Sequence, residues 1–121
     1  MTLTYSEDDS TKTATIAVSG KITKEDYDAA ITPMQAFIDK HGSVNFIEIV
    51  ESFAGFEPSI IWPGLKFDMA NLKHIDRVAV VSDIGWISPI TKAAGYFMST
   101  KLRMFDMSEL EEAQAWVRSS A

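Results

Sequence analysis

Two short apolar runs constrain the fold of this chain more than any other feature of its sequence. Val44 to Val50 is rich in β-branched and aromatic residues, and Val78 to Ser82 is almost continuously apolar. Strands of this kind are typically buried on both faces, as in a parallel or mixed sheet flanked by helices. An α/β fold is therefore predicted, with Ile47, Ile49 and Val80 among its most buried residues.

Three further strands are predicted around these runs. Thr2 to Tyr5 and Thr13 to Ser19 flank a short polar connection, which favours an antiparallel pair. Lys101 to Phe105 is expected to be the last strand. The five strands should form one mixed sheet, in which the initial pair is antiparallel and the rest is mainly parallel.

Four helices are predicted to alternate with the strands, in the order ββαβαβαβα. The first has Thr23 as N-cap, with Asp26 as a weak capping box, and stops at Gly42; Pro33 inside it should cause a kink or a local break. The others are expected from about Pro58 to Lys73, after Gly85, and after a capping box of Ser108 and Glu111. In the last helix the candidates for burial are Leu110, Ala113, Ala115, Trp116 and Val117. At 121 residues, the whole of residues 1–121 is expected to form a single domain.

Composition and charge exclude several classes of protein. A net charge of −6 argues against a nucleic-acid binder, because phosphate contacts need clustered Lys and Arg. The absence of cysteine removes disulfides, thiolate metal sites and thiol nucleophiles. The acidic N-terminus does not resemble an export signal, and the chain has no apolar run long enough to span a bilayer. A cytoplasmic protein is expected.

The predicted helix at about residues 58–73 carries apolar side chains on two faces. On a helical wheel, Trp62, Leu65 and Met69 belong to one stripe, and Ile60 and Phe67 belong to a second. A helix that buries only one face does not need the second stripe. The second stripe should therefore meet another element, a ligand, a partner or a membrane surface.

Aromatic residues give the better lead to a function. Trp62 and Trp86 lie near the starts of two helices that should meet at one edge of the sheet. One interpretation makes these rings ordinary core, and the other makes them the lining of an apolar pocket under a mobile helix. The ligand-binding candidates of the second interpretation are Phe53, Phe56, Trp62, Leu65, Met69, Trp86, Ile90 and Phe97.

The helix at residues 58–73 is the candidate lid of this pocket, with Pro63-Gly64 as a soft spot. Residues 58–105 carry six bases and three acids, so this part of the chain is locally positive. These charges are either scattered and solvated or bias the region toward an anionic membrane surface. The candidates for membrane contact are Ile60, Trp62 and Phe67, flanked by Lys66 and Lys73.

No constellation of residues predicts catalysis, a metal site or a cofactor. His41 and His74 have no carboxylates at ligand spacing, and His41 suits a helix C-terminus. Asp83 ends a buried strand, where capping the next helix is a simpler role than catalysis. The protein is therefore predicted not to be an enzyme.

Ordered segments along nearly the whole chain resemble the SpoIIAA-like proteins, a bacterial group near the STAS domains and, more distantly, the CRAL-TRIO lipid carriers. The resemblance is carried by Gly20-Lys21-Ile22-Thr23 with Asp26-Tyr27, Phe53-Ala54-Gly55-Phe56 with Trp62, Val80-Val81-Ser82-Asp83 with Trp86, Arg103-Met104-Phe105, and Ala113 to Trp116. STAS-type anti-sigma-factor antagonists present a phosphorylatable serine at the start of the helix after the third strand. Ser59 is roughly in place here, but no Asp-Ser pair precedes it, and Glu57 would oppose a phosphate.

Two functions follow as hypotheses. The first is a non-enzymatic module that binds an apolar or lipid-like small molecule and associates reversibly with the inner face of the cell membrane. The alternative is a STAS-type regulatory module that binds another protein. Homo-oligomerisation is left open.

Overall fold

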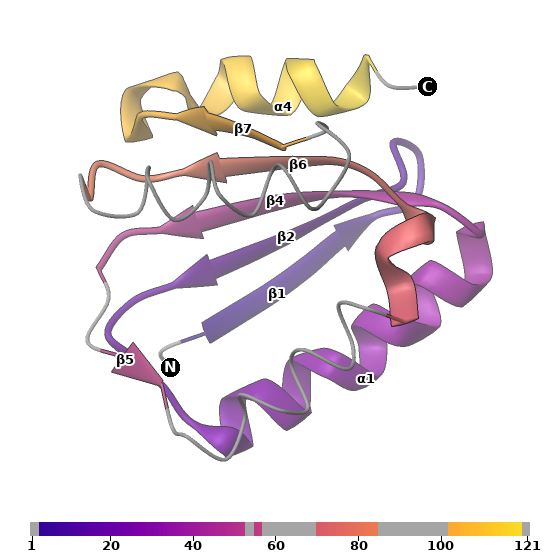
Figure 1. Cartoon of the computed structure of the whole chain (residues 1–121), viewed down its shortest axis with the longest axis horizontal. Coiled ribbons are helices and arrows are strands. Elements are labelled where there is room, and N and C mark those ends of the chain that lie inside the picture. Colours follow the sequence, from indigo (N-terminus) through magenta and orange to yellow (C-terminus); the bar gives the residue numbers. More distant parts are fainter. Residues whose placement is uncertain (1–2, 53–54, 57–69, 85–101, 120–121) are drawn as a thin grey trace.

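A computed structural model describes residues 3–52, 55–56, 70–84 and 102–119 of the chain. Its main sheet has five strands in the order β1-β2-β4-β6-β7 (Figure 1). The first two strands are antiparallel and every other pair is parallel, as predicted. The strands are β1 (Leu3–Asp8), β2 (Thr13–Val18), β4 (Val44–Val50), β6 (Ile75–Val81) and β7 (Leu102–Phe105).

A second, two-stranded sheet pairs β3 (Lys21–Ile22) with β5 (Gly55–Phe56) in parallel. It was not predicted from the sequence. It lies beyond the carboxyl ends of β2 and β4, where Gly20 N also donates to the carbonyl oxygen of Ser52 at 3.1 Å. Gly20 has a φ of 85°, a conformation that favours glycine at this turn.

Helix α1 (Lys24–His41) begins as the sequence predicts. The Thr23 side chain accepts a hydrogen bond from the backbone N–H of Asp26 at 3.2 Å and donates to the Asp26 carboxylate at 2.9 Å. The helix ends at Gly42, which has a φ of 77°. Pro33 lies inside the helix without breaking it, so the expected local break is not found. The apolar stripe holds this segment helical despite the missing proline N–H.

The two faces of the main sheet are packed by different helices. Ala14, Phe46 and Val80 join Phe37 and Ile38 of α1 in one buried cluster. Consecutive residues of a strand point to opposite faces. Accordingly Ile47, Ala79 and Val81 pack on the other face, against Ala113 and Val117 of α4 (Leu110–Arg118). Figure 1 shows α1 beside β1, and α4 beside β7 and β6.

The start of the last helix differs from the prediction. A short 3₁₀ turn, η3 (Met107–Glu109), precedes α4. The backbone N–H of Asp106 donates to the Glu109 side chain at 2.8 Å, so the cap forms two residues before the expected Ser108–Glu111 box.

Two burial predictions are also wrong. Ile49 is only half-buried, and Ala115 is exposed. Ile47 and Val80, in contrast, are buried, at 3% and 5% exposure. Ala113 and Val117 are fully buried, while Leu110 and Trp116 are half-buried.

Two α-helices, α1 and α4, lie wholly within the described ranges, where the sequence predicts four along the chain. The helix expected at about residues 58–73 and the one expected after Gly85 fall mostly on residues 57–69 and 85–101, which lie outside the described residues. Residues 70–71 are helical, and a 3₁₀ turn, η2 (Leu72–His74), leads from them into β6.

The tip of the β1–β2 hairpin is fastened to the C-terminus of α1. The Asp9 carboxylate accepts from Lys40 Nζ at 2.9 Å and lies 2.9 Å from His41 Nε2. The His41 ring also contacts Phe37 edge-on at 4.7 Å between centroids. The hydrogen bonds from Lys40 and His41 lower the pKa of Asp9 below 3.8.

Acid should weaken the contact of Asp9 with Lys40 and His41. Because the pKa of Asp9 is lower in the folded than in the unfolded chain, its contribution to stability is present above pH 3.8 and is lost as the pH falls through the lowered pKa. Asp9→Asn should therefore destabilise the protein at neutral pH, and the difference from wild type should shrink on acidification. Urea denaturation across the acid range measures this, with Glu112→Gln, an exposed change on α4, as the control. A pH-independent difference would show that Asp9 acts through packing alone.

Candidate functional site

The face of the main sheet that packs on α1, here called the α1-facing surface, has a row of mostly half-buried side chains between two rows that are mostly buried. Neighbouring residues Ala14, Phe46 and Val78 are buried in one row of this surface. The next row lies two residues nearer the carboxyl ends of the parallel strands. This central row crosses all five strands through Tyr5, Ile16, Glu48, Val80 and Met104. Only Val80 in it is buried, and the other four side chains are half-buried.

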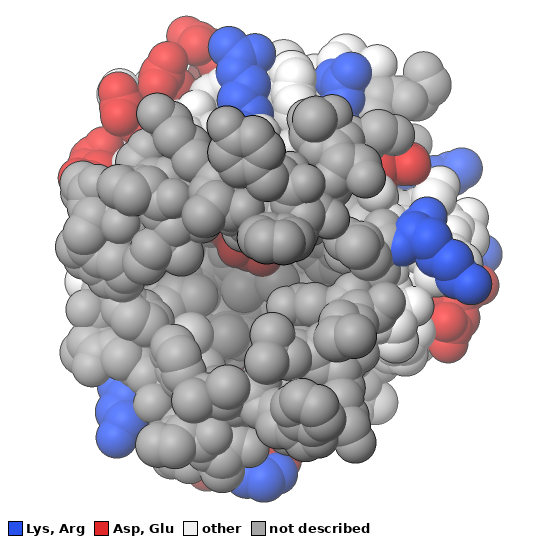
Figure 2. Space-filling model, in the orientation of Figure 1, with Lys and Arg blue, Asp and Glu red and all other residues white. Residues whose placement is uncertain are grey.

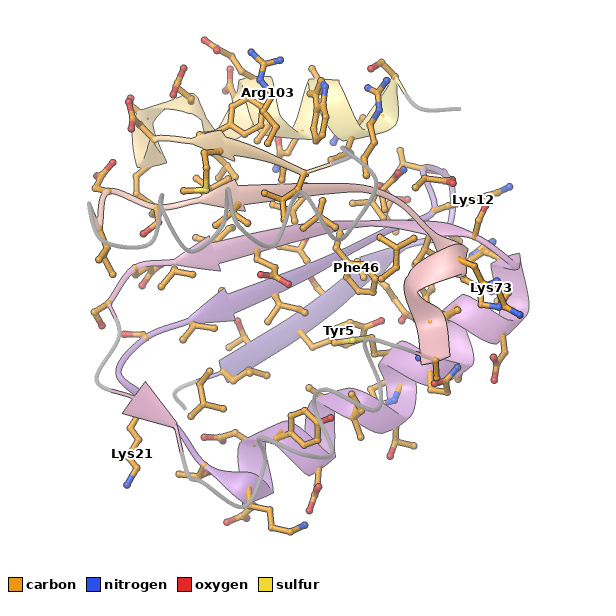
Figure 3. All side chains as sticks on the ribbon, viewed as in Figure 1. Tyr5, Lys12, Lys21, Phe46, Lys73 and Arg103 are labelled. Atoms are coloured by element: carbon orange, nitrogen blue, oxygen red, sulfur yellow. The ribbon has the colours of Figure 1, made fainter. Side chains whose placement is uncertain are left out.

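The position of the half-buried row along the strands matters for function. In α/β proteins, ligands usually bind beyond the carboxyl ends of the strands. Tyr5 and Phe46 lie on the α1-facing surface (Figure 3), and Phe46 belongs to its closed part. The central row is one step closer to the carboxyl edge, and the row beyond it is buried again at Leu3, Val18 and Ser82.

Glu48 is the charged member of the central row. Its neighbours in register are Ile16 on β2 and Val80 on β6, both apolar. A carboxylate in such a position loses hydration and needs a polar or charged partner. Glu48 has an interaction within the chain. Figure 2 shows mainly residues outside the described ranges on this side of the molecule, with described Lys, Arg, Asp and Glu side chains around its rim.

Tyr5 gives the row a second polar group at its edge. Its hydroxyl donates to the Glu7 carboxylate at 2.8 Å. Burial, reinforced by this hydrogen bond, raises the pKa of Tyr5. The phenol therefore remains a neutral donor at physiological pH.

Hydroxyl and carboxylate groups organise the carboxyl edge of the sheet. Ser82 Oγ donates to the carbonyl oxygen of Val50 at 2.8 Å and accepts from the N–H of Ile84 at 3.1 Å. The Asp83 carboxylate accepts from the N–H of Met107 at 2.9 Å, so it secures the turn after β7. Ser52 Oγ accepts from Gly20 N at 3.0 Å. These contacts give each side chain a structural role in shaping the edge.

The residues just before β6 are tied to α1 by a pair of amides. Gln35 Nε2 donates to Asn71 Oδ1 at 3.1 Å, and Asn71 Nδ2 donates to Gln35 Oε1 at 3.0 Å. Asn71 is 3% exposed. His74 Nδ1 donates to the carbonyl oxygen of Gly42 at 2.8 Å, which fixes the proton on Nδ1. Residues 70–74 are thus anchored at both ends.

Most of the predicted site residues lie outside the described residues. These are Phe53, Ser59, Ile60, Trp62, Leu65, Lys66, Phe67, Met69, Trp86, Ile90 and Phe97. The backbone of Phe56 pairs with Ile22 in the small sheet. Lys73 is exposed in η2 (Figure 3).

Three of the six bases counted in residues 58–105 can be placed, and they do not all lie on one surface. Arg77 Nη1 donates to the carbonyl oxygen of Trp116 at 2.6 Å, on the α4 face. The guanidinium of Arg103 lies over the Phe105 ring, 5.0 Å from its centroid, on the same face. Lys73 lies before β6, next to the α1 C-terminus. Membrane attachment through these three bases is therefore not supported by a common patch.

The described part of the chain shows neither a metal-binding cluster nor a membrane-spanning helix. Among these residues, no group of three or more His, Asp or Glu side chains is placed to hold a metal ion. None of the helices described is both long and apolar enough to cross a membrane.

Sequence reasoning missed Glu48 and the Gln35–Asn71 pair. Glu48 could have been noticed as the acid in an otherwise apolar strand, although its place in the central row depends on the strand register. No sequence signal joins Gln35 to Asn71, because they are far apart in the chain.

The chain was compared with known proteins. Residues 13–118 match the SpoIIAA-like family. The structure is similar to the crystal structure of an uncharacterized protein of the DUF3478 family with a SpoIIAA-like fold from Shewanella loihica PV-4. The TM-score is 0.74 at 20% sequence identity, covering 95% of this chain and 91% of the other. No curated protein matches the chain.

Proposed function

The chain belongs to the SpoIIAA-like family, and we propose that it is a non-enzymatic module that binds an apolar or lipid-like small molecule on its α1-facing surface. The SpoIIAA-like fold also fits a STAS-type module. The proposal therefore concerns what the module binds.

The half-buried central row of the α1-facing surface is the observation that carries the proposal. Ala14, Phe46 and Val78 are covered, but one row farther along Ile16 and Met104 remain half-buried. Ligand pockets are lined mainly by apolar and aromatic side chains. A small apolar ligand would gain about 25 cal/mol for each Å² of apolar surface removed from water.

Residues 58–73 are proposed to cover this ligand as a lid. The sequence supports the proposal with two apolar stripes and the Pro63-Gly64 soft spot. The paired amides of Gln35 and Asn71 supply an anchor at the end of the segment. A lid needs one fixed end of this kind, about which the rest can move.

Binding should be detectable with simple amphiphiles. Titration with a non-ionic alkyl detergent below its micelle concentration is expected to raise the melting temperature, because the ligand binds only the folded chain. Trp62→Ser should lose most of this rise if Trp62 lines the pocket. Ala115→Ser, which alters an exposed site on α4, should keep it. If neither native mass spectrometry nor melting detects binding to the wild type, the ligand proposal is wrong.

Membrane association is tested separately with anionic vesicles. If Ile60, Trp62 and Phe67 enter the headgroup region, tryptophan fluorescence should shift to the blue, and Trp62→Ser should lose most of the shift. Each buried apolar side chain contributes about 1.5–3 kcal/mol, which gives reversible adsorption rather than anchoring. If detergent binds but anionic vesicles cause no shift in tryptophan fluorescence, the protein would be a small-molecule carrier that does not dock on membranes.

A protein-binding role is the second candidate, and the SpoIIAA-like fold is the observation that favours it. In this role the module would act as a STAS-type regulator, with Ser59 as the proposed phosphorylation site. Mass spectrometry of the protein from its native cells tests the modification. If Ser59 carries no phosphate, the module would bind its protein partner without a phosphorylation switch.

A further inference from the structure

We propose that β1 is the interface of a homodimer, in which the β1 strands of two copies of this chain pair in antiparallel fashion and join the two main sheets into one. This inference is independent of the ligand proposal. It follows from the place of β1 in the sheet, from the exposure of its side chains and from the distribution of its charges.

The outer edge of β1 has no strand beside it. β1 lies at one end of the main sheet and pairs with β2 along all six of its residues. Within the described part of the chain, no backbone hydrogen bond joins β1 to any element other than β2. In an antiparallel pair, the backbone groups of alternate residues point away from the neighbouring strand. The outer edge of β1 therefore offers N–H and C=O groups to a further strand.

Most side chains of β1 are exposed. These are Thr4, Ser6, Glu7 and Asp8, while Leu3 is buried and Tyr5 is half-buried. Leu3 packs in a cluster with Ala30 of α1, so α1 covers the face of β1 to which Leu3 belongs. On the opposite face, which holds Thr4 and Ser6, α4 packs against β4, β6 and β7. That face of β1 is therefore free to adjoin a second copy.

The charges of β1 favour an antiparallel pair of identical strands. Charged side chains commonly protect an edge strand from pairing. In β1 the charges are Glu7 and Asp8, both at the hairpin end, and the segment from Thr4 to Ser6 is uncharged at neutral pH. Two parallel copies would place the acids side by side, which destabilises a strand pair. A two-fold axis places them at opposite ends of the interface.

The same reasoning selects a register. An axis through Tyr5 places the two Tyr5 residues opposite one another and Thr4 opposite Ser6 of the second copy. Aromatic pairs and hydroxyl pairs of this kind stabilise antiparallel strands. An axis through Glu7 would instead bring two carboxylates together, and an axis through Ser6 would leave them closer than the axis through Tyr5 does. The register centred on Tyr5 is therefore the favoured one.

The other edge of the sheet does not offer an equivalent closed arrangement with β1. Pairing β1 of one copy with β7 of the next would leave a free edge at each end, so the assembly would grow into a filament. Pairing β1 with itself uses the same surface twice and closes as a dimer. Because one pair of short strands buries little surface, the dimer should be weak and reversible.

Sedimentation velocity of the full chain tests the dimer. The sedimentation coefficient should rise with concentration between about 10 μM and about 1 mM, the range expected for a small interface. A monomer throughout this range would overturn the inference.

Two double variants test the register. Thr4→Lys with Ser6→Lys places lysine opposite lysine on both sides of the axis and should weaken the dimer at least about tenfold. Thr4→Lys with Ser6→Glu places lysine opposite glutamate at the same two positions and should restore it. Thr4 and Ser6 are exposed, so both variants should fold, and melting curves establish that they do.

Thr32→Lys with Ala36→Lys is the matched control for the lysine pair, because it adds the same two charges at exposed positions of α1. The control should dimerise as the wild type does. If it weakens the dimer as much as the two lysines on β1, the effect is one of net charge and the β1 interface is wrong.

Cross-linking locates the interface directly, since the chain has no cysteine of its own. A mixture of Thr4→Cys and Ser6→Cys chains, treated with a thiol oxidant, should form the mixed disulfide in preference to either homodimer. Equal formation of the three products would overturn the proposed register. None of these outcomes bears on whether the α1-facing surface binds a ligand.

Discussion

Phe37→Ala is expected to lower the free energy of unfolding by about 3–5 kcal/mol. Phe37 is 2% exposed and lies where α1 meets Val44, Phe46 and Val78. The substitution removes a whole ring from a close-packed cluster and leaves a cavity that its neighbours can fill only in part. It also removes the edge contact with His41, 4.7 Å between ring centroids.

Urea denaturation followed by circular dichroism measures this effect. Thr32→Ala, at an exposed position of α1, is the control and should change stability by no more than about 0.5 kcal/mol. A loss below about 1 kcal/mol for Phe37→Ala would mean that the cavity collapses or that α1 is not packed as described.

Trp116→Ala is expected to cost about 2–3 kcal/mol, less than the loss of a fully buried tryptophan, because the side chain is half-buried. Its ring lies 6.0 Å from that of Phe105. The guanidinium carbon of Arg77 lies 4.9 Å from the Trp116 ring centroid, which adds a cation–π contact. Trp116 thus closes the side of the cluster formed around Ala113 and Val117.

A double-mutant cycle separates the packing of the Trp116 ring from its cation–π contact with Arg77. Trp116→Ala and Arg77→Leu should be coupled by about 0.5–1 kcal/mol if the guanidinium and the ring interact directly. Arg77→Leu also removes the hydrogen bonds of Arg77 to the carbonyl oxygen of Trp116 and to Ser119 Oγ, both 2.6 Å. An unchanged melting temperature for Trp116→Ala would show that the ring contributes no packing to α4.

The strands and the first helix could be predicted because local patterns determine them. Val44–Val50 is the strand that its β-branched and aromatic residues predict. Thr23 and Gly42 are the two ends that the capping pattern predicts for α1. The last helix shows the limit of this reasoning. Asp106 with Glu109 and Ser108 with Glu111 fit the same spacing, and only the first pair forms.

In other parts of the chain, prediction failed because the structure depends on pairing between strands that are far apart in the sequence. β6 begins at Ile75, three residues before the apolar run, because Ile75 pairs with Val44 of β4. The start of β6 could not be recognised in the sequence, because Asp76 and Arg77 follow it and charged residues are uncommon in buried strands. The strands of the small sheet have two residues each, too few to show a period. Glu48 reads as a member of the α1-facing surface only once the strand register is known, since a shift of one residue would place it on the other face.

The strand order of the main sheet has a consequence for how the chain assembles during synthesis. Each strand from β2 onward is added beside the one that precedes it in that sheet, so the sheet grows from β1 to β7 in a single direction. No later strand has to be inserted between two earlier ones. A chain emerging from the ribosome can therefore extend the sheet strand by strand, with an unpaired growing edge that passes from β2 to β4, then to β6 and finally to β7. The exposed edges are the parts of a nascent sheet most open to wrong pairing, and here they are always β1 and the newest strand.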